Sequence, residues 1–350
     1  NGDGSKCDGT LLVPSEYSTI QSAIDAASED DSVIVLAGTY VENITWPATN
    51  GIKLIGSGVD NCIIDGGASA SVIRLEEDLG GIIDSTTLIT GFTIQNGYAH
   101  DHPNDYGGGI FLYNSSPTLK DMTFSGNTAI RGGGMHLEFS LPNLTNVTIS
   151  ENMANVWGGG MYLQTANPTM MNVIISNNMA EQDGGGIFVY DGDLSLSNVT
   201  ISGNTAELDG GGMYFYESGS TFSSTSTLTG VTFSGNSAGA DGGGMFLFSS
   251  NATLTDVTFS GNSADYSGGG MVIWESSPTL TNVTFSNNAA NEDGGGMFLY
   301  QSSPTLTDVT IINNMAENGG GMRLINSSPT LKNSIIWDNS PQSIYISSGE

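Results

Sequence analysis

Basic residues are scarce in this sequence. It has 7 Lys and Arg against 36 Asp and Glu in 350 residues, which gives a formal net charge of -29. Nucleic-acid phosphates and anionic lipid headgroups are bound through positively charged surfaces, so neither is an expected partner. Long hydrophobic runs are also missing. No apolar stretch approaches the roughly 20 residues that cross a bilayer, and we expect no transmembrane segment.

Cysteine is nearly absent, with only Cys7 and Cys62 in the chain. We expect a disulfide between them that ties the N-terminal tail to the body of the fold, and two unpaired thiols are the alternative. Charged residues make up only 12% of the chain, while Gly, Ser, Thr and Asn abound. That composition is typical of extracellular repeat proteins. We therefore expect a secreted or cell-surface protein. The chain starts without an export segment, so its signal peptide is expected to have been removed.

Glycine, in contrast, is abundant and regularly placed. Triplets of glycine begin at Gly107, Gly132, Gly158, Gly184, Gly210, Gly242, Gly268, Gly294 and Gly319, at spacings of 25, 26, 26, 26, 32, 26, 26 and 25 residues. Each repeat continues with an apolar-x-apolar segment, a Ser-rich turn, Thr-Leu-Thr, and a segment like Val-Thr-Phe-Ser-Gly-Asn. Three short alternating stretches per repeat predict three strands per coil of an all-β parallel β-helix, a solenoid with coils of about 26 residues.

Alternation within each strand separates core positions from surface positions. The residue directly after each triplet, such as Met135, and the residue two positions later are expected to point inward, as are the columns that start at Leu119, Met122 and Phe124. Stacked coils bury such columns in a continuous core. A further column consists of asparagines at a turn, from Asn127 to Asn339, and we interpret it as a structural ladder of side-chain amides.

The N-terminal residues depart from the repeat. Thr10–Val13 and Ser32–Ala37 are predicted strands, and Tyr17–Ala27 has apolar residues at helical spacing. We expect this short amphipathic helix to cover the open end of the solenoid. The predicted organisation is an N-terminal cap with irregular early coils over residues 1–96, regular coils over 97–339, and a C-terminal end or the start of a further segment over 340–350.

Several segments resemble known β-helix families. Val13-Pro-Ser-Glu-Tyr-Ser-Thr-Ile-Gln-Ser-Ala-Ile-Asp25, Ala37-Gly-Thr-Tyr-Val-Glu-Asn43 and Gly91-Phe-Thr-Ile-Gln-Asn96 resemble the N-terminal cap and early coils of the pectin-lyase-like right-handed β-helix superfamily. The Gly-Gly-Gly-Met and Phe-Ser-Gly-Asn motifs resemble repeats of chlamydial polymorphic outer-membrane proteins and related bacterial surface proteins. The resemblance implies a right-handed single-stranded parallel β-helix. It leaves function open, because the superfamily includes lyases, esterases, epimerases, adhesins and inert stalks.

Aromatic residues gather at the outward positions of the first strand of each coil. The first ring column holds Phe111, His136, Tyr162, Phe188, Tyr214, Phe246, Val272, Phe298 and Arg323, and the second ring column holds Tyr113, Glu138, Gln164, Tyr190, Tyr216, Phe248, Trp274, Tyr300 and Ile325. A purely structural ladder of stacked rings is one interpretation. An exposed aromatic patch of this length also indicates a partner surface for a glycan, a protein or a second copy. The candidate contacts are Phe188, Tyr190, Tyr214, Tyr216, Phe246, Phe248, Trp274, Phe298 and Tyr300.

Acidic residues gather just before the glycine triplets. Glu181, Asp183, Glu207, Asp209, Asp241 and Asp293 are candidate ligands for Ca²⁺, which would relieve the repulsion between like charges on neighbouring coils. An unoccupied acidic edge screened by salt is the alternative. The repeated Gly-Gly-x-Gly-x-Asp signature of calcium-binding repeat proteins is missing.

Residues for catalysis are few. His100, His102, Arg131, His136 and Glu138 are weak candidates for a metal site or an acid/base pair, and a polar loop is the simpler interpretation. Lyases of the superfamily use a Lys or Arg base, yet the coils from Gly158 to Met322 contain no Lys, Arg or His. We therefore expect a non-catalytic, adhesin-type surface protein, with a polysaccharide-lyase-like enzyme as an alternative. Ice binding is a further alternative, because Thr-Leu-Thr recurs at Thr227, Thr253, Thr279 and Thr305, although Lys120, Met171 and Lys332 interrupt the columns.

Overall fold

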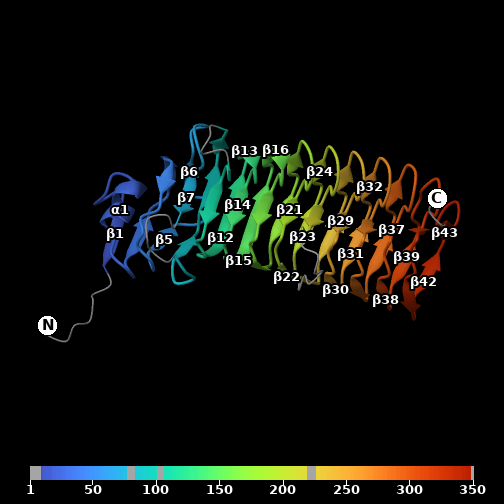
Figure 1. Cartoon of the computed structure of the whole chain (residues 1–350). Helices are drawn as coiled ribbons and strands as arrows, with labels where there is room; N and C mark the ends of the chain where they lie inside the picture. The colour runs from blue at the N-terminus through green and yellow to red at the C-terminus, as the bar shows by residue number, and fades with distance from the viewer. Residues whose placement is uncertain (1–8, 77–82, 101–105, 219–225, 348–350) are drawn as a thin grey trace, which may run out of the picture.

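The computed structural model describes residues 9–76, 83–100, 106–218 and 226–347. They form an elongated right-handed parallel β-helix with the N-terminal cap at one end and strand β43 at the other (Figure 1). The predicted fold class is confirmed. Every pairing between named strands is parallel, and the strands stack into three sheets of 12, 8 and 23 strands. None of the helices in the described chain is long and apolar enough to cross a membrane.

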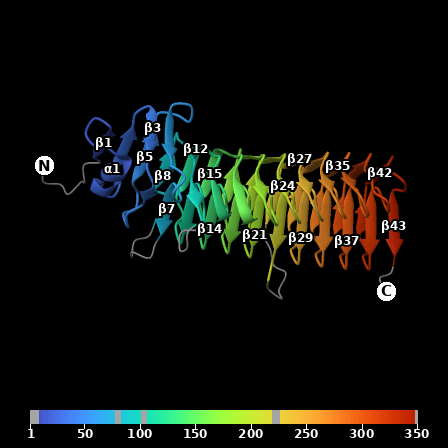
Figure 2. The ribbon, with the colours of Figure 1, turned by 90° about the horizontal axis from the view of Figure 1, so that it is seen from above.

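The 12-stranded sheet takes one strand from each coil after the first, and these strands lie side by side along the solenoid (Figure 2). Its strands are β4 (Ile44–Thr45), β7 (Ile73–Glu76), β11 (Ile110–Tyr113), β14 (Met135–Glu138), β17 (Met161–Gln164), β21 (Ile187–Tyr190), β25 (Met213–Tyr216), β29 (Met245–Phe248), β33 (Met271–Trp274), β37 (Met297–Tyr300), β40 (Met322–Ile325) and β43 (Ile344–Ser347). Because β7 of the early coils pairs with β11 of the regular ones, one sheet runs through both regions.

The 23-stranded sheet contains two rows of strands that meet at a corner. The first row is β1 (Thr10–Val13), β2 (Ser32–Val35), β5 (Lys53–Gly56), β8 (Leu88–Thr90), β12 (Thr118–Ser125), β15 (Asn143–Ser150), β18 (Thr169–Met171), β22 (Ser195–Ser197), β26 (Thr227–Thr229), β30 (Thr253–Thr255), β34 (Thr279–Thr281), β38 (Thr305–Thr307) and β41 (Thr330–Lys332). The second row is β3 (Gly38–Val41), β6 (Cys62–Asp65), β9 (Thr93–Gln95), the second halves of β12 and β15, β19 (Ile174–Ser176), β23 (Thr200–Ser202), β27 (Thr232–Ser234), β31 (Thr258–Ser260), β35 (Thr284–Ser286), β39 (Thr310–Ile312) and β42 (Ile335–Trp337).

The corner between these rows explains a departure from the prediction of three strands per coil. Asp121 and Asn146 occupy the corner with φ of 50° and 54°, and Asn or Asp adopts this left-handed conformation more readily than most residues. The second half of β12 and of β15 is therefore bent away from the first half. Most regular coils consequently have four short strands distributed over three sheets.

The eight-stranded sheet follows the asparagine turn. Its strands are β10 (Tyr98–Ala99), β13 (Thr128–Arg131), β16 (Met153–Trp157), β20 (Met179–Ala180), β24 (Thr205–Ala206), β28 (Ser237–Ala238), β32 (Ser263–Ala264) and β36 (Ala289–Ala290). From here the chain returns through a glycine triplet to the 12-stranded sheet. Gly184 has φ +68°, and a Cβ on Gly185 would lie 2.4 Å from the Thr205 carbonyl oxygen of the next coil. The coils can approach this closely only without side chains at these positions.

The predicted inward columns form the core. The methionine column after the triplets and the Leu119, Met122 and Phe124 columns are buried over the regular coils up to Met322. Within the core, Phe233, Phe259 and Phe285 stack with ring centroids 4.7 Å apart and nearly parallel planes. Repetition of one residue type at one position thus gives neighbouring coils complementary surfaces.

The asparagine ladder is also confirmed. Asn236 Nδ2 donates to the Ile201 carbonyl and to Asn262 Oδ1, both at 2.9 Å, and the Asn236 backbone N–H donates to the same Asn262 Oδ1 at 3.0 Å. The pattern repeats from Asn127 to Asn314. Since these amides are buried, their hydrogen bonds satisfy groups that would otherwise be costly to remove from water.

The N-terminal helix α1 (Ile20–Ala26) is shorter than predicted. Thr19 ends the extended segment before it and accepts a hydrogen bond from the Ser22 N–H, while the Glu42 carboxylate accepts from the Ile20 and Gln21 N–H groups. Such capping places the helix start at Ile20. Ile20, Ala23 and Ile24 are fully buried in the main core, so the helix covers the end of the solenoid. At the opposite end, Trp337 and Ile346 are each 69% exposed.

Candidate functional site

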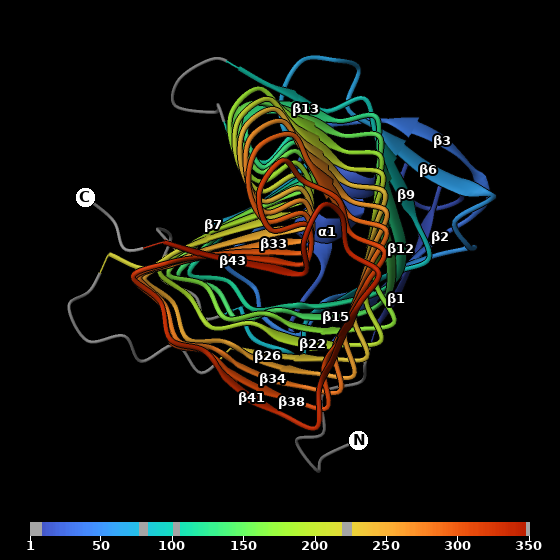
Figure 3. The same cartoon turned by 90° about the vertical axis from the view of Figure 1, so that its right-hand side faces the viewer.

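The segments that precede the glycine triplets pack against the outer face of the 12-stranded sheet, and we call this packed seam the crease. Viewed along the axis, these segments loop beside the sheet that contains β7, β33 and β43 (Figure 3). The Trp157 ring lies 5.3 Å from Phe188, and a Cβ on Gly184 would lie 2.8 Å from Phe188 Cβ. The first ring column therefore lies between the sheet and the pre-triplet segments, inside the crease.

The first ring column is buried, which corrects the prediction that it is exposed. Phe188, Phe246 and Phe298 are only 5%, 5% and 6% exposed. Phe246 and Phe298 pack with Val272 in an apolar cluster separate from the main core, and Phe188 stacks on Tyr214. Their side chains do leave the sheet outward, as the alternation predicts. The pre-triplet segments then cover them. These three rings are accordingly packing residues, and Tyr214 is half-buried in the same column.

The second ring column remains half-buried and open on one side. Tyr190 stacks on Tyr216 at 5.4 Å, Tyr216 on Phe248 at 5.3 Å, and Trp274 on Tyr300 at 4.2 Å between centroids. The five residues come from five successive strands, β21 to β37, paired in register. Because stacked rings cover each other's faces, this column presents mainly ring edges outward.

Aspartates line the wall of the crease. We call Asp183, Asp209, Asp241 and Asp293 the carboxylate column. The Asp209 N–H donates to Asp183 Oδ1 (3.1 Å), the Asp241 N–H to Asp209 Oδ1 (2.9 Å) and the Ser267 N–H to Asp241 Oδ1 (2.7 Å). Asp183, Asp209 and Asp241 thus each link their own coil to the next, whereas Asp293 Oδ1 lies 3.4 Å from Arg323 Nε of the next coil.

Burial changes the acidity of this column. It raises the pKa of Asp209 to about 7; the Asp241 N–H opposes that rise, and the charges of Asp241 and Asp183 add to it. Burial also raises the pKa of Asp183 and of Asp241. Part of the carboxylate column is therefore protonated near neutral pH, which reduces the repulsion between coils.

The predicted calcium ligands are only partly brought together. Asp183 and Asp209 are neighbours, but both Asp183 oxygens already accept hydrogen bonds, Oδ2 from Trp157 Nε1 at 3.1 Å. Glu207 is exposed, and Glu181 Oε1 accepts from Asn155 Nδ2 at 3.3 Å. Within the described residues, no three His, Cys, Asp or Glu side chains converge as a metal-binding group. The hydrogen bonds of the carboxylate column are an alternative use of these acids. Calcium binding stays a prediction.

Three of the weak catalytic candidates meet at the N-terminal end of the crease. His136 is 1% exposed and lies between Tyr106 (4.7 Å) and Tyr162 (4.8 Å), with Nε2 3.8 Å from Glu138 Oε2. The Arg131 guanidinium lies 4.7 Å from the Trp157 ring centroid. Burial lowers the pKa of His136, and the Glu138 carboxylate and the Arg131 backbone oppose that fall.

The cluster is thus a neutral imidazole next to a guanidinium and a carboxylate. His100 stacks instead on Tyr98, at 4.2 Å, and His102 lies outside the described residues. Tyr106 and Trp157 also line this cluster, and neither was a candidate on sequence grounds. Both directly precede a glycine triplet, as Arg131 and Asp183 do, so an alignment of that single position would have revealed them.

The predicted disulfide is not tested, because Cys7 lies outside the described residues. Cys62 is fully buried, and its thiol lies 3.5 Å from the Leu36 carbonyl oxygen. Burial raises the pKa of this thiol. The pairing of Cys7 with Cys62 stays a prediction.

Comparison with known proteins identifies the family. A sequence model of the right-handed β-helix region matches residues 32–239 and 193–350. No curated protein matches the chain. Among solved structures, the catalytic domain of a GH87 alpha-1,3-glucanase variant in complex with tetrasaccharides aligns with a TM-score of 0.57 at 12% identity, over 98% of this chain and 68% of that one.

Two more solved structures are similar at lower scores. The A-module of Azotobacter vinelandii mannuronan C-5 epimerase AlgE4 has a TM-score of 0.47 at 15% identity, over 99% of this chain and 98% of that one. Pectin methylesterase from carrot has a TM-score of 0.43 at 9% identity, over 100% and 91%. Such low identities bear on fold alone. The chain belongs to the right-handed β-helix family, as the resemblance of its N-terminal cap led us to expect.

Proposed function

We propose that this chain is a non-catalytic, extracellular β-helix that binds a glycan along the half-buried second ring column. One observation carries the proposal: five rings, Tyr190, Tyr216, Phe248, Trp274 and Tyr300, lie on five successive strands in register and stay accessible although the neighbouring column is covered. Phe248, Trp274 and Tyr300 also pack on the buried cluster of Phe246, Val272 and Phe298, yet they keep accessible surface in a row that a partner can contact.

The chemistry of this surface suits a hydroxyl-rich chain. Ring edges carry partial positive charge and attract oxygen atoms, and Tyr190, Tyr216 and Tyr300 add hydroxyl groups that donate and accept hydrogen bonds. A linear glycan along the solenoid axis would meet one ring per coil of about 4.8 Å. The tetrasaccharide bound by the glucanase of similar fold supports a glycan only as a class, because one fold serves many functions.

The lack of Lys, Arg and His in the coils that carry the second ring column supports a binding role over a lyase. Between Gly158 and Met322 the sequence has no Lys, Arg or His, so a cleft enzyme there would depend on carboxylates or tyrosines. The His136 cluster lies further toward the N-terminus and has its titratable nitrogens buried. Release of unsaturated or shortened products from the bound glycan would instead support the lyase-like enzyme.

A triple variant tests the surface. We expect a glycan array to identify a ligand for the unmodified chain, and Tyr216→Ala, Trp274→Ala and Tyr300→Ala together to weaken it at least tenfold, because a few aromatic contacts dominate such interfaces. Tyr266→Ala is the matched control, since Tyr266 is 50% exposed but lies before a triplet and outside the column. Unchanged binding by the triple variant contradicts the proposal. Binding only to a protein or to a second copy contradicts the glycan.

Ice binding is a second candidate, favoured by the geometry of the threonines. Strands β26, β30, β34 and β38 pair in register, so Thr227, Thr253, Thr279 and Thr305 form one column and Thr229, Thr255, Thr281 and Thr307 another. The first column is exposed and the second is exposed or half-buried. These β-branched side chains are stiff, and they form an uncharged lattice of hydroxyl and methyl groups.

Growing an ice crystal in the protein solution tests this candidate. If the lattice binds ice, we expect a gap between the melting and freezing temperatures, and Thr255→Lys with Thr281→Lys should abolish it because both changes lie at the centre of the array. The same changes at Thr148 and Thr200, on the neighbouring row of the sheet, are the control. The absence of both a temperature gap and crystal shaping excludes the candidate.

A further inference from the structure

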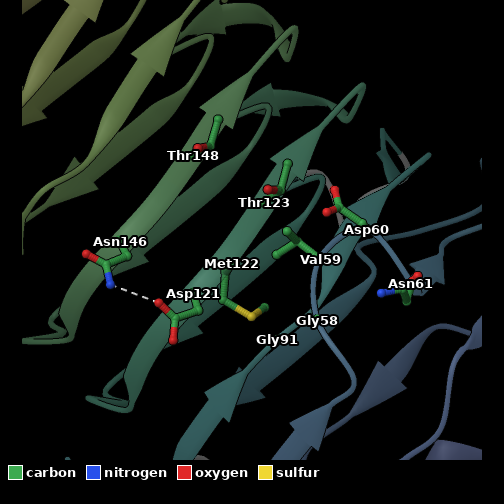
Figure 4. Close-up of a pocket in the computed structure, with 10 residues that line it drawn as sticks. All are labelled: Gly58, Val59, Asp60, Asn61, Gly91, Asp121, Met122, Thr123, Asn146 and Thr148. Carbon is green, nitrogen blue, oxygen red and sulfur yellow. Dashed lines mark hydrogen bonds between the residues drawn. The ribbon is translucent and has the colours of Figure 1, made fainter.

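A surface pocket of about 400 Å³, open to solvent and here called the cavity, lies on the outer face of the 23-stranded sheet, away from the crease (Figure 4). Among its lining residues Asp60, Asp121 and Asn146 are exposed, and Thr123 and Thr148 are half-buried. It is bounded by the loop between β5 and β6 and by strands β12 and β15. Its polar lining side chains are Asp60, Asn61, Asp121, Thr123, Asn146 and Thr148. We propose that this cavity binds one neutral sugar residue, at a site independent of the second ring column.

The overhanging loop is fixed in place. The Gly58 N–H donates to the Gly91 carbonyl at 3.1 Å, the Thr93 hydroxyl to the Val59 carbonyl at 2.8 Å, and the Gly38 N–H to the Asn61 carbonyl at 2.8 Å. Gly91 has φ +79°, and a Cβ there would lie 2.6 Å from the Gly56 carbonyl oxygen. The loop therefore approaches the sheet only because residue 91 is glycine. A cavity formed in advance costs little ordering when a ligand enters.

The floor of the cavity is equally well positioned. Asp121 and Asn146 occupy the left-handed corners of two neighbouring coils, and Asn146 Nδ2 donates to Asp121 Oδ1 at 2.9 Å. Asn146 Oδ1 accepts from Asn172 Nδ2 at 3.2 Å, and Lys120 Nζ lies 3.8 Å from Asp121 Oδ2. Thr123 and Thr148 are register neighbours, and Figure 4 shows their side chains on the open face of their strands.

The lining selects the chemical class of the ligand. Carboxylates accept hydrogen bonds from hydroxyl groups, amides both donate and accept, and threonine hydroxyls do the same. No lining residue is cationic, so Asp60 and Asp121 would repel a carboxylate or phosphate on the ligand. Lys120 already lies beside Asp121. The volume is near the lower end of small-molecule sites, which suits one sugar ring and is far too large for a bare metal ion. Val59 adds an apolar contact for sugar C–H groups.

Titration of the whole chain with single sugars tests the proposal. We expect glucose, galactose, mannose or N-acetylglucosamine to shift the methyl resonances of Thr123 and Thr148, with dissociation constants in the millimolar range, and glucuronate to cause no shift. Thr123→Val with Thr148→Val removes two hydroxyl groups at nearly constant shape and should weaken binding about tenfold or more. Thr258→Val with Thr284→Val, in the same sheet column several coils away, is the matched control.

Several outcomes would overturn the proposal. One is that no neutral sugar shifts the methyl resonances of Thr123 and Thr148, and another is that glucuronate binds as tightly as the neutral sugars. Saturation of the site by a simple alkylammonium ion alone, or equal sugar binding by the two double valine variants, would also overturn it. The triple ring variant of the second ring column separates the two sites. It should leave this binding intact, so failure of one site says nothing against the other.

Discussion

At the residue scale, the carboxylate column shows how the fold uses acidic side chains in a chain of net charge -29. Asp209 accepts a backbone hydrogen bond from the next coil while it lies between Asp183 and Asp241. The neutral carboxyl is favoured there because water is largely excluded. The sequence predicted this gathering of acids but not their protonation, since acidity depends on burial that residue spacing alone does not reveal.

The raised pKa of Asp209 predicts a pH dependence of stability. The pKa of Asp209 is about 7 in the fold and near 3.8 when the chain is unfolded. The contribution of the protonated Asp209 carboxyl to the free energy of unfolding is therefore complete below pH 3.8 and is lost as the pH rises toward 7. We expect Asp209→Asn to have a higher free energy of unfolding than the unmodified chain at pH 8. At pH 5 the difference between the two proteins should be smaller. Denaturant unfolding at both pH values measures the difference.

The difference in stability between the unmodified chain and Asp209→Asn reports Asp209 together with its coupling to Asp183 and Asp241. Burial raises the pKa of both neighbours as well, and they are present in both proteins. His136 has a lowered pKa, so its own contribution is lost in the opposite direction, as the pH falls below 6.5, and it is the same in both proteins. Asp65 and Asp84 have lowered pKa values and stay ionised in this range. A stability difference between the two chains that does not change with pH would refute the account.

At the scale of elements, alternation along the strands predicted every inward column correctly. It also predicted that the first ring column leaves the sheet outward, yet Phe188 and Phe246 are buried. Alternation predicts on which side of its own sheet a side chain lies. It does not predict whether another segment of the chain covers that side. That segment became recognisable only through Trp157 and the carboxylates packed against the column.

The asparagine ladder gives a prediction at the same scale. Asn236→Ala removes an acceptor shared by the Asn204 N–H and Asn204 Nδ2, and a donor to the Ile201 carbonyl. Leaving such buried groups unpaired should lower the free energy of unfolding by about 2–4 kcal/mol. Asn291→Ala, at an exposed position, should change it by less than about 0.5 kcal/mol. Urea unfolding of both variants decides, and equal losses would mean that the ladder contributes no special stability.

At the scale of the whole molecule, the repeat made the fold predictable and left the function undetermined. Periodic glycines and asparagines define one coil, and stacking repeats it, so the architecture follows from a single template. A binding surface depends instead on which columns stay accessible, as Tyr216 and Trp274 do, and on loops such as residues 57–61 that depart from the template. The helix that covers the N-terminal end was recognisable because its apolar spacing differs from that of the strands.

The central claim is that a glycan binds along the second ring column, and a crystal structure of the chain with the ligand identified by the array tests it most directly. The account predicts a glycan that follows the solenoid axis from Tyr190 to Tyr300 and contacts rings on at least three successive coils. A ligand bound instead at the His136 cluster, on the threonine columns or across the ends of the solenoid would contradict it.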